Sequence, residues 1–336
     1  MRFKKLAVFF MIGVLVVGCL SGCKDKDENA SKESKKNNVS SSSIVFKVGK
    51  EKCSVSEAKV LLLNYQNQYR DVYGVDLWSA TGADNTELVT YIKDLTVSQL
   101  AEIYLMSHIG TDQDMELTEE EMAHVEAAAA AYYSSLNQEE KDYTGATEKD
   151  IKSLYEHYAM ARKVYATLTQ GVNQEVSDDA ARVMSVMQIY NEDEAKVRNA
   201  YNQLKKGNDF AKTAKTYGSL TSIHSTINRA DTPDDIEETV FGLSNKEYTE
   251  VLPLGEGYVI YYCVNNMEEE LTLENKDVVL KQRMEDAVNK TYSTYAASTD
   301  SKLYTDKWSK VSMEPNEAMV TISFFDVFEE HCGEDY

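Results

Sequence analysis

Proline and histidine are scarce in this sequence: the chain has 3 Pro and 5 His among its 336 residues. Because proline interrupts helices, its scarcity, together with 22 tyrosines and long charged stretches, favours a mainly helical body. The histidines show no metal-binding spacing such as HExxH. No stretch has the pattern of a nucleophile site or a phosphate loop. The sequence therefore predicts neither a metal nor a cofactor.

Basic charge is also in short supply. The chain carries 35 Lys and Arg against 56 Asp and Glu, which gives a formal net charge of −21 at pH 7. So acidic a protein is repelled by nucleic acid and by anionic lipid surfaces. We therefore expect nucleic acid to be absent from its partners.

Cysteines are few beyond the N-terminal region. Past Cys23 the sequence contains Cys53, Cys263 and Cys332, an odd number whose spacing matches no metal motif. We therefore expect no disulfide framework. Cys53 and Cys263 lie in strand-like surroundings, where a thiol serves as a small buried apolar group.

A long apolar run near the start, Leu6 to Cys19, follows three basic residues. It is shorter than the ~20 residues that a membrane-spanning helix needs. A basic start, a short apolar core and small residues before a cleavage point are typical of a secretory signal. The sequence thus predicts an export signal.

The four residues Leu20-Ser21-Gly22-Cys23 resemble the cleavage box of bacterial lipoproteins. This resemblance implies that residues 1–22 are a signal peptide and that Cys23 is diacylated as the mature N-terminus. The protein would then lie outside the cytoplasm on a cell-membrane lipid anchor, as on a Gram-positive-type cell surface. An ordinary secretory signal with a chance cysteine is the alternative.

Residues 23–43 are expected to be the lipidated cysteine and a tether. Lys24–Ser43 contains one apolar side chain larger than alanine, Val39, and no aromatic residue. Such a segment cannot bury enough surface to offset the entropy of ordering it. We therefore predict a disordered linker between the lipid and the folded body.

The folded body begins with residues 44–175. A strand is expected at 44–48, and helices follow. Ser54-x-x-Glu57 and Thr118-x-x-Glu121 are capping boxes, each of which marks a helix start. This segment is predicted to be the first part of a mainly helical module.

The pattern changes in residues 176–266, where a strand, short helices and a second strand indicate a small α+β unit. Residues 267–336 return to a helix over 271–297, and a final strand is expected at 319–328. The sequence thus predicts an α+β fold in which a mainly helical module is interrupted by an α+β insert.

The two helical segments are expected to pack on each other. An apolar face that includes Leu62 and Tyr69 has no partner within its own segment, and neither has one that includes Leu280 and Met284. The tyrosines of residues 155–165 allow two interpretations, an aromatic binding surface or a helix–helix core, and the core is favoured.

The insert contains stretches that resemble a known family. Glu194-Ala195-Lys196 and the run Gln203–Tyr217 (QLKKGNDFAKTAKTY) closely resemble the parvulin pattern EAK…LKxGxDFAxLAKxYS. Val240–Ser244 resembles the family's AFxLxxGE segment, and Gly255–Ile260 is similar to its closing strand, xFGYHII. Parvulins are peptidyl-prolyl cis-trans isomerases, so the resemblance implies a parvulin-like α+β domain at 176–266.

The N-terminal part extends this resemblance. Val48-Gly49-Lys50-Glu51, followed by Val55–Lys59, resembles the opening of the helical module in PrsA/SurA-type foldases. In that group a parvulin domain interrupts a helical chaperone module, and the Gram-positive members are lipoproteins. The resemblance covers most of the mature chain. It implies a SurA-N-like module and, as partners, unfolded or newly secreted polypeptides.

The chain departs from the parvulin pattern where the isomerase has its polar groups. The two family histidines fall on Val186 and Val259, and the GGDLG loop is replaced by Ser222–Arg229. Valine neither donates nor accepts a hydrogen bond, so the family's hydrogen-bonded histidine set cannot form. His224, within the replaced loop, is more readily explained as a surface residue than as a substitute.

The resemblance leaves an apolar proline pocket without catalytic residues. Its lining would be Met184, Val186, Phe241 and Val259, which we interpret as a substrate-binding surface. The expected function is a lipid-anchored extracytoplasmic foldase or chaperone whose parvulin-like domain is catalytically weak or inactive. The alternatives are an active peptidyl-prolyl isomerase and an assembly or structural lipoprotein with one fixed partner.

Overall fold

The computed structural model describes residues 39–74, 87–313 and 316–336. The predicted signal peptide, Cys23 and most of the tether lie outside the described residues. The chain forms two compact units: a helical unit made of residues up to Gln170 together with Ala287–Tyr336, and an insert, Gly171–Asp286. We expected boundaries after residues 175 and 266. The second lies twenty residues later because the long helix that begins at Glu269 belongs to the insert in its first half.

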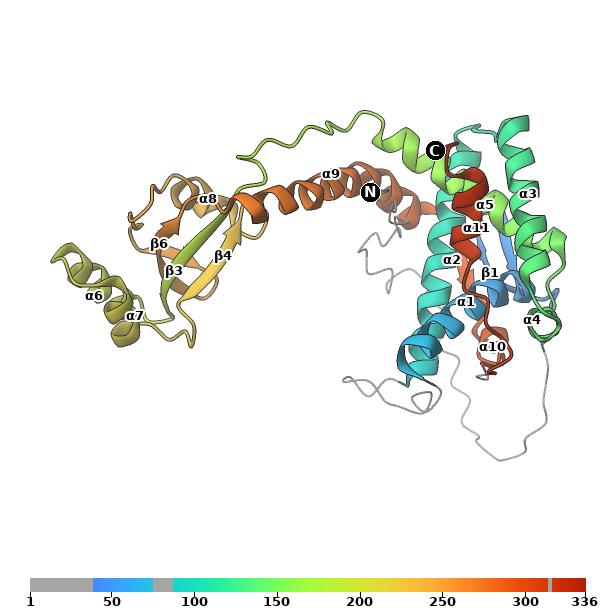
Figure 1. Ribbon diagram of the computed structural model, residues 1–336, viewed down its shortest axis with the longest axis horizontal. Helices are drawn as coiled ribbons and strands as arrows, with labels where there is room; N and C mark the ends of the chain where they lie inside the picture. Colours follow the sequence, from blue (N-terminus) through green and yellow to red (C-terminus); the bar gives the residue numbers. More distant parts are fainter. Residues whose placement is uncertain (1–38, 75–86, 314–315) are drawn as a thin grey trace. The chain divides into compact units, whose positions relative to one another are not determined.

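The helical unit is built around five helices (Figure 1): α1 Val55–Tyr73, α2 Leu88–Asp112, α3 Glu119–Ser135, α4 Gln138–Thr144 and α5 Glu148–Thr169. A small antiparallel sheet of order β2-β1-β7 joins them, with β1 at Ile44–Val48, β2 at Glu51–Ser54 and β7 at Ser301–Leu303. From the later part of the chain come the C-terminal half of α9 Glu269–Ser298, then α10 Thr305–Trp308 and α11 Phe324–Cys332.

The capping boxes form as the sequence predicts. The side chain of Ser54 accepts a hydrogen bond from the Glu57 N–H, and the Glu57 carboxylate accepts one from the Ser54 N–H. Thr118 with Glu121 does the same at the start of α3. These reciprocal bonds satisfy N–H groups that a helix otherwise leaves unpaired, so they fix where each helix begins.

The ordered chain starts earlier than expected. The Ser56 N–H donates to the Ser41 C=O, the Val55 N–H donates to the Ser43 C=O, and Val39 packs against the helical core. The predicted tether therefore ends before Val39, because these backbone groups find partners at the start of α1.

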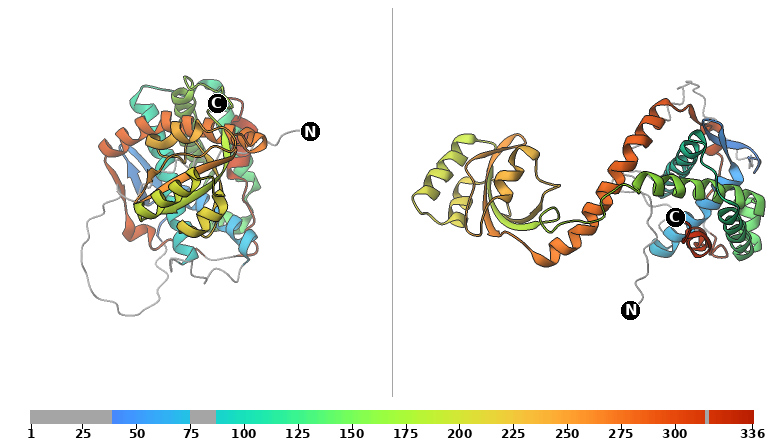
Figure 2. Two further views of the ribbon diagram at one scale, coloured as in Figure 1. Left: turned by 90° about the vertical axis from the view of Figure 1, so that its left-hand side faces the viewer. Right: turned by 90° about the horizontal axis from the view of Figure 1, so that it is seen from above.

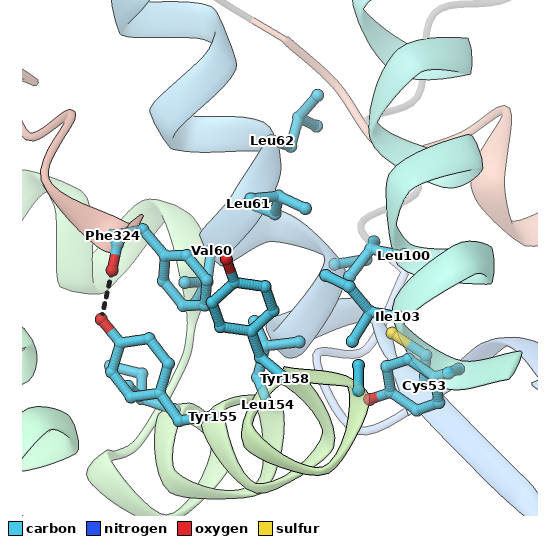
Figure 3. Packing of buried hydrophobic residues seen from close by; sticks show 14 of the residues in the cluster. Cys53, Val60, Leu61, Leu62, Leu100, Ile103, Leu154, Tyr155, Tyr158 and Phe324 are labelled. Carbon is cyan, nitrogen blue, oxygen red and sulfur yellow. Dashed lines mark hydrogen bonds between the residues drawn. The ribbon is translucent and has the colours of Figure 1, made fainter. Parts of the chain in front are cut away.

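Aromatic residues occupy the centre of the helical unit. Tyr155 stacks on Phe324 with ring centroids 4.5 Å apart, and Tyr132 meets the same phenylalanine edge-on at 5.4 Å. Figure 3 shows this packing, in which the Tyr155 hydroxyl donates to the Phe324 carbonyl oxygen at 2.6 Å. Tyr155 and Tyr158 are buried, so the core interpretation of this tyrosine series is confirmed.

The predicted strand at 319–328 is wrong. Residues 319–323 form no strand, and α11 begins at Phe324. The apolar residues Phe324, Phe325, Phe328 and Cys332 recur at helical spacing and are all buried, whereas Val320 and Ile322 are exposed. Residues 324–332 therefore follow the helical period of their apolar side chains, and the alternation of residues 319–323 does not produce a strand.

A buried carboxylate holds the C-terminal segment in the helical unit. Glu140 is fully buried and accepts hydrogen bonds from the N–H groups of Val320 and Thr321, each at 2.7 Å, and from the Thr321 hydroxyl at 2.8 Å. The Asn67 amide adds a bond to the Thr321 carbonyl oxygen. These bonds join residues 180 to 254 positions apart in the chain, so they connect the two chain segments of the helical unit that flank the insert in the sequence.

The insert is a four-stranded antiparallel sheet of order β4-β3-β6-β5. Its strands are β3 Val183–Asn191, β4 His224–Asn228, β5 Leu252–Leu254 and β6 Gly257–Asn265. Helices α6 Glu194–Lys205 and α7 Phe210–Tyr217 contribute to one apolar cluster of the sheet, and α8 Asp234–Phe241 contributes to another. Figures 1 and 2 show these helices beside the strands of the insert. The α+β character of the insert and its strand–helix–strand order agree with the sequence prediction.

Helix α9 carries an apolar surface that the sequence assigned to the helical core. Val288 and Tyr292 are buried there, but neither Leu280 nor Met284 belongs to that core. Leu273, earlier in the helix, is 67% exposed. The predicted packing therefore holds for the C-terminal half of α9 alone. Within the described parts of the chain, no helix is both long and apolar enough to cross a membrane.

The Glu140 anchor can be tested by substitution. Glu140→Ala leaves several buried donors without an acceptor, so we expect the free energy of unfolding of the helical unit to fall by about 3–5 kcal/mol. The measurement is urea denaturation followed by circular dichroism. Glu139→Ala removes an exposed carboxylate one position earlier in the same helix, and its effect should stay below about 1 kcal/mol. Equal effects of the two substitutions would contradict the anchoring role.

Candidate functional site on the sheet of the insert

The structure brings the four predicted pocket residues together, and it buries them. Met184 and Val186 come from β3, Phe241 ends α8, and Val259 lies on β6. All four belong to one apolar cluster, and none is more than 2% exposed. In this structure they form a closed core between the sheet and α8, and they offer no surface to a proline of another chain.

The register of the sheet separates the two predicted histidine positions. Val186 lies opposite Cys263, whereas Val259 lies opposite Tyr190. The two valines share a face of the sheet but are four ladder positions apart, about 13 Å along the strands. Side chains at these positions cannot hydrogen-bond to each other. The structure therefore does not bring together the pair that the family's polar set would need.

A polar pair that the sequence analysis missed lies between these positions. Gln188 is opposite Tyr261, and its amide nitrogen donates to the Ser225 hydroxyl at 2.7 Å. Gln188 follows Val186 by two residues, so strand alternation places it on the same face. A polar residue within an apolar strand, on the face that carries Val186, was the signal that could have revealed it. An amide and a hydroxyl can donate and accept hydrogen bonds, but neither titrates near neutral pH.

Two arginines hold Phe241 in place. The guanidinium carbons of Arg182 and Arg229 lie 5.3 and 4.8 Å from the centroid of its ring. Arg182 also donates to the Phe241 carbonyl oxygen at 2.8 Å. The Asp179 carboxylate pairs with both arginines, and Glu237 pairs with Arg229. Cation–π contacts of this kind stabilise the ring in its buried position, so Phe241 is fixed within the core.

His224 does not replace the missing histidines. It lies opposite Met187 at the start of β4, and Met187 packs on the cluster that α6 and α7 cover. Its side chain is therefore on the other face of the sheet from Phe241. Among the described residues no hydrogen bond or ion pair reaches its ring. It is an exposed residue of an edge strand, as expected.

The cysteines that the structure describes are buried. Cys53 and Cys263 are fully buried apolar groups, as predicted, and burial raises the pKa of both thiols. Over the described ranges, no three His, Cys, Asp or Glu side chains are grouped so as to hold a metal ion.

These features define a class of fold: a helical unit built from two separate chain segments, with an antiparallel α+β unit inserted between them. No protein-family model matches the sequence, and no curated protein matches it either. Solved structures do resemble the chain.

The PrsA peptidylprolyl isomerase of Bacillus cereus is 15% identical over 74% of this chain and 97% of its own, with a TM-score of 0.41. The PrsA foldase of Lactococcus lactis is 12% identical over 85% of this chain and 99% of its own, with a TM-score of 0.29. A SurA-like chaperone of Campylobacter jejuni is 11% identical over 77% and 98%, with a TM-score of 0.27.

The helical unit has a small pocket of its own between α2 and α5. It is lined by Gln99, Glu102, Ile103, Met106, Tyr158 and Ala161. One carboxylate oxygen of Glu102 is buried without a hydrogen-bond partner, and burial raises the pKa of this carboxyl to about 8. The negative charge of an ionised Glu102 contributes to raising the pKa of Tyr65 and of Tyr158.

Glu102 predicts a pH dependence of stability. Its folded pKa of about 8 lies above the ordinary value of 4.5, so between these values the folded chain holds a proton that the unfolded chain has lost. The free energy of unfolding therefore falls as pH rises through this window. Glu102→Gln should remove this pH dependence, and at pH 8 its free energy of unfolding should exceed that of the wild type by about 1–3 kcal/mol.

The measurement is urea denaturation at pH 4 to 9, with the exposed Glu139→Gln as the control. The Glu102→Gln and wild-type curves should converge near pH 4, where both side chains are neutral. Parallel curves across the whole range would show that Glu102 is ionised in the folded protein at neutral pH.

Proposed function

We propose that this protein is a lipid-anchored extracytoplasmic foldase or chaperone that binds unfolded or newly secreted polypeptides. Its insert is a parvulin-like domain that has lost efficient isomerase catalysis. The observation that supports the loss of catalysis is the closed apolar cluster of Met184, Val186, Phe241 and Val259, which stands where the family resemblance places the isomerase site. The solved proteins similar to this chain are named peptidylprolyl isomerases, foldases and SurA-like chaperones. This chain is assigned to that functional class from its sequence motifs.

The parvulin-like motif has structural roles in the insert. Asp209 caps α7 by accepting the Lys212 N–H at 2.9 Å. Phe210 then inserts between the helices and the sheet, with its ring 5.1 Å from that of Tyr262. Gly207 has a φ of +86°, a conformation that favours glycine. The resembling residues thus specify the α6–α7 turn and its packing, which is compatible with the loss of catalysis.

Weak catalysis follows from the chemistry of proline isomerisation. The reaction twists an amide against a barrier of ~18–20 kcal/mol and needs no nucleophile. Polar groups placed near the reacting bond typically contribute ~10²–10⁴ in rate. Because Val186 and Val259 supply no such groups and are buried, the domain retains little of this contribution.

An active isomerase and an assembly lipoprotein with one fixed partner are the competing functions. The closed cluster argues against efficient catalysis by the insert. The fixed-partner function would give selective capture of a single protein, whereas a chaperone binds chains of unrelated sequence. Membrane attachment is common to all three, so it does not separate them.

The proposal predicts binding without turnover. The chain from Lys24 onward should suppress aggregation of an unfolded model client such as thermally unfolded citrate synthase. In a protease-coupled assay on a proline tetrapeptide, its catalytic efficiency should lie ~10²–10⁴ below that of an active parvulin. Efficiency within about tenfold of an active parvulin would contradict the proposal.

The double substitution Val186→His with Val259→His is the matched test of the site. Because about 13 Å separates these positions along the sheet, we expect no gain of isomerase activity. A gain would mean that the sheet register differs from the one described.

Lipid attachment is a separate prediction. Cys23 follows the Leu20-Ser21-Gly22 box, so Cys23→Ala should leave the precursor unprocessed and remove the lipid from the protein in the native host. Intact-mass measurement of protein extracted from membranes checks this result. Cys19→Ala, inside the apolar run, serves as the control and should be processed normally. An unmodified Cys23 in membrane-extracted protein would contradict the lipid anchor.

A further inference from the structure

The two edges of the sheet in the insert differ in what they expose. At one edge, β5 has three residues, and its central residue is Pro253, which has no N–H group. At the other edge, β4 has five residues, His224–Asn228, with no proline and no lysine. Proline, charged side chains and very short strands are the usual means of preventing further strand pairing. One edge has such protection, and β4 has none.

The hydrogen-bond pattern shows which groups of β4 face outward. The Gln188 N–H donates to the Ile223 carbonyl oxygen at 2.8 Å, so these residues form a hydrogen-bonded pair just before β4. Bonded and non-bonded pairs alternate along an antiparallel ladder. Ser225 and Ile227 are therefore bonded to β3. The N–H and C=O groups of Thr226, between them, point away from the sheet.

Thr226 is the open position at the centre of this edge. The neighbouring outward carbonyl oxygens already accept hydrogen bonds, that of His224 from the Ser222 hydroxyl at 3.2 Å and that of Asn228 from the Thr232 hydroxyl at 2.8 Å. In the described parts of the chain, no hydrogen bond occupies the N–H or C=O of Thr226. The residue is exposed. It therefore offers one donor and one acceptor in the geometry of a strand pair.

We propose that the outer edge of β4 binds an extended segment of an unfolded polypeptide, which joins the sheet as a fifth strand beside Thr226. The inference rests on the proposed function and specifies how a client is held. Strand addition uses backbone hydrogen bonds, so it tolerates many client sequences. It also leaves the cluster around Phe241 closed and requires no proline in the client.

An extended client fits this edge better than a second copy of the chain. Each copy carries a net charge of −21, so two copies repel each other over the distances at which proteins meet. An unfolded segment that is neutral or basic experiences no such repulsion. The short side chains along β4, Ser225 and Thr226 among them, leave room for varied neighbours.

The test uses a substitution that spares the existing sheet. Thr226→Pro removes an outward N–H that β3 does not use, and Thr226→Val keeps it. The probe is a fluorescein-labelled, proline-free peptide of alternating valine and threonine with lysine at each end. By fluorescence anisotropy, Thr226→Pro should bind it about tenfold more weakly than the wild type. Thr226→Val should stay within about twofold. Unchanged affinity of Thr226→Pro would overturn the proposal.

A second measurement leaves the protein unaltered and so avoids any folding defect of the variant. N-methylation of every peptide residue removes the donors from both edges of the added strand, so that a shift of register cannot restore them. The fully methylated peptide should bind about tenfold more weakly than the unmethylated one. Equal affinity of the two peptides would overturn strand addition. A dimer in sedimentation experiments that the peptide dissociates would show instead that a second copy occupies the edge.

Failure of this inference can be told apart from failure of the proposed function. If Thr226→Pro retains both peptide affinity and aggregation suppression, the chaperone function stands and the β4 edge is not its site. If the wild type neither binds the peptide nor suppresses aggregation, the proposed function itself is wrong.

Discussion

The helical unit depends on hydrogen bonds between its N-terminal helices and a segment that returns to it after the insert. The carboxylate of Glu140 accepts bonds from Val320 and Thr321 in a fully buried position. Such a charge is costly to bury unless several donors surround it, so the C-terminal segment and α4 need each other. The same contact brings Phe324 onto Tyr155. The helical unit is therefore made of chain segments on both sides of the insert, and it is complete only when the segment that follows the insert has been synthesised.

Local features of the fold could be predicted from the sequence, and long-range ones could not. The capping box of Ser54 and Glu57 depends on four residues, and it forms as predicted. The α11 helix was missed although its apolar residues recur at helical spacing, because residues 319–323 alternate like a strand and the packing of α11 on Tyr155 and Tyr158 involves residues that are distant in sequence. At the candidate site, the four residues chosen from the parvulin resemblance do belong to one apolar cluster. The register between β3 and β6, which separates Val186 from Val259, is set by pairing that no local pattern contains.

The candidate site replaces polarity with packing. In the parvulin-like pattern the inner face of the sheet would carry histidines, whereas here Val186, Val259 and Cys263 fill it and are at most 1% exposed. Arg182 and Arg229 cover the ring of Phe241 and are themselves neutralised by Asp179. A closed apolar cluster of this kind stabilises the insert. The residues that the resemblance assigns to a proline pocket are part of the insert's own core.

A chaperone of the kind proposed above, with this cluster closed, needs another way to hold chains of unrelated sequence. Backbone N–H and C=O groups are the only hydrogen-bonding groups that every client shares. A folded protein offers them where a strand has an unpaired edge, and β4 has such an edge at Thr226 while Pro253 blocks the edge at β5. The unpaired N–H and C=O groups therefore lie on β4, the strand whose Ser225 hydroxyl accepts a hydrogen bond from Gln188. The apolar cluster on the sheet can therefore stay closed while the outer edge of β4 remains free to pair with another strand.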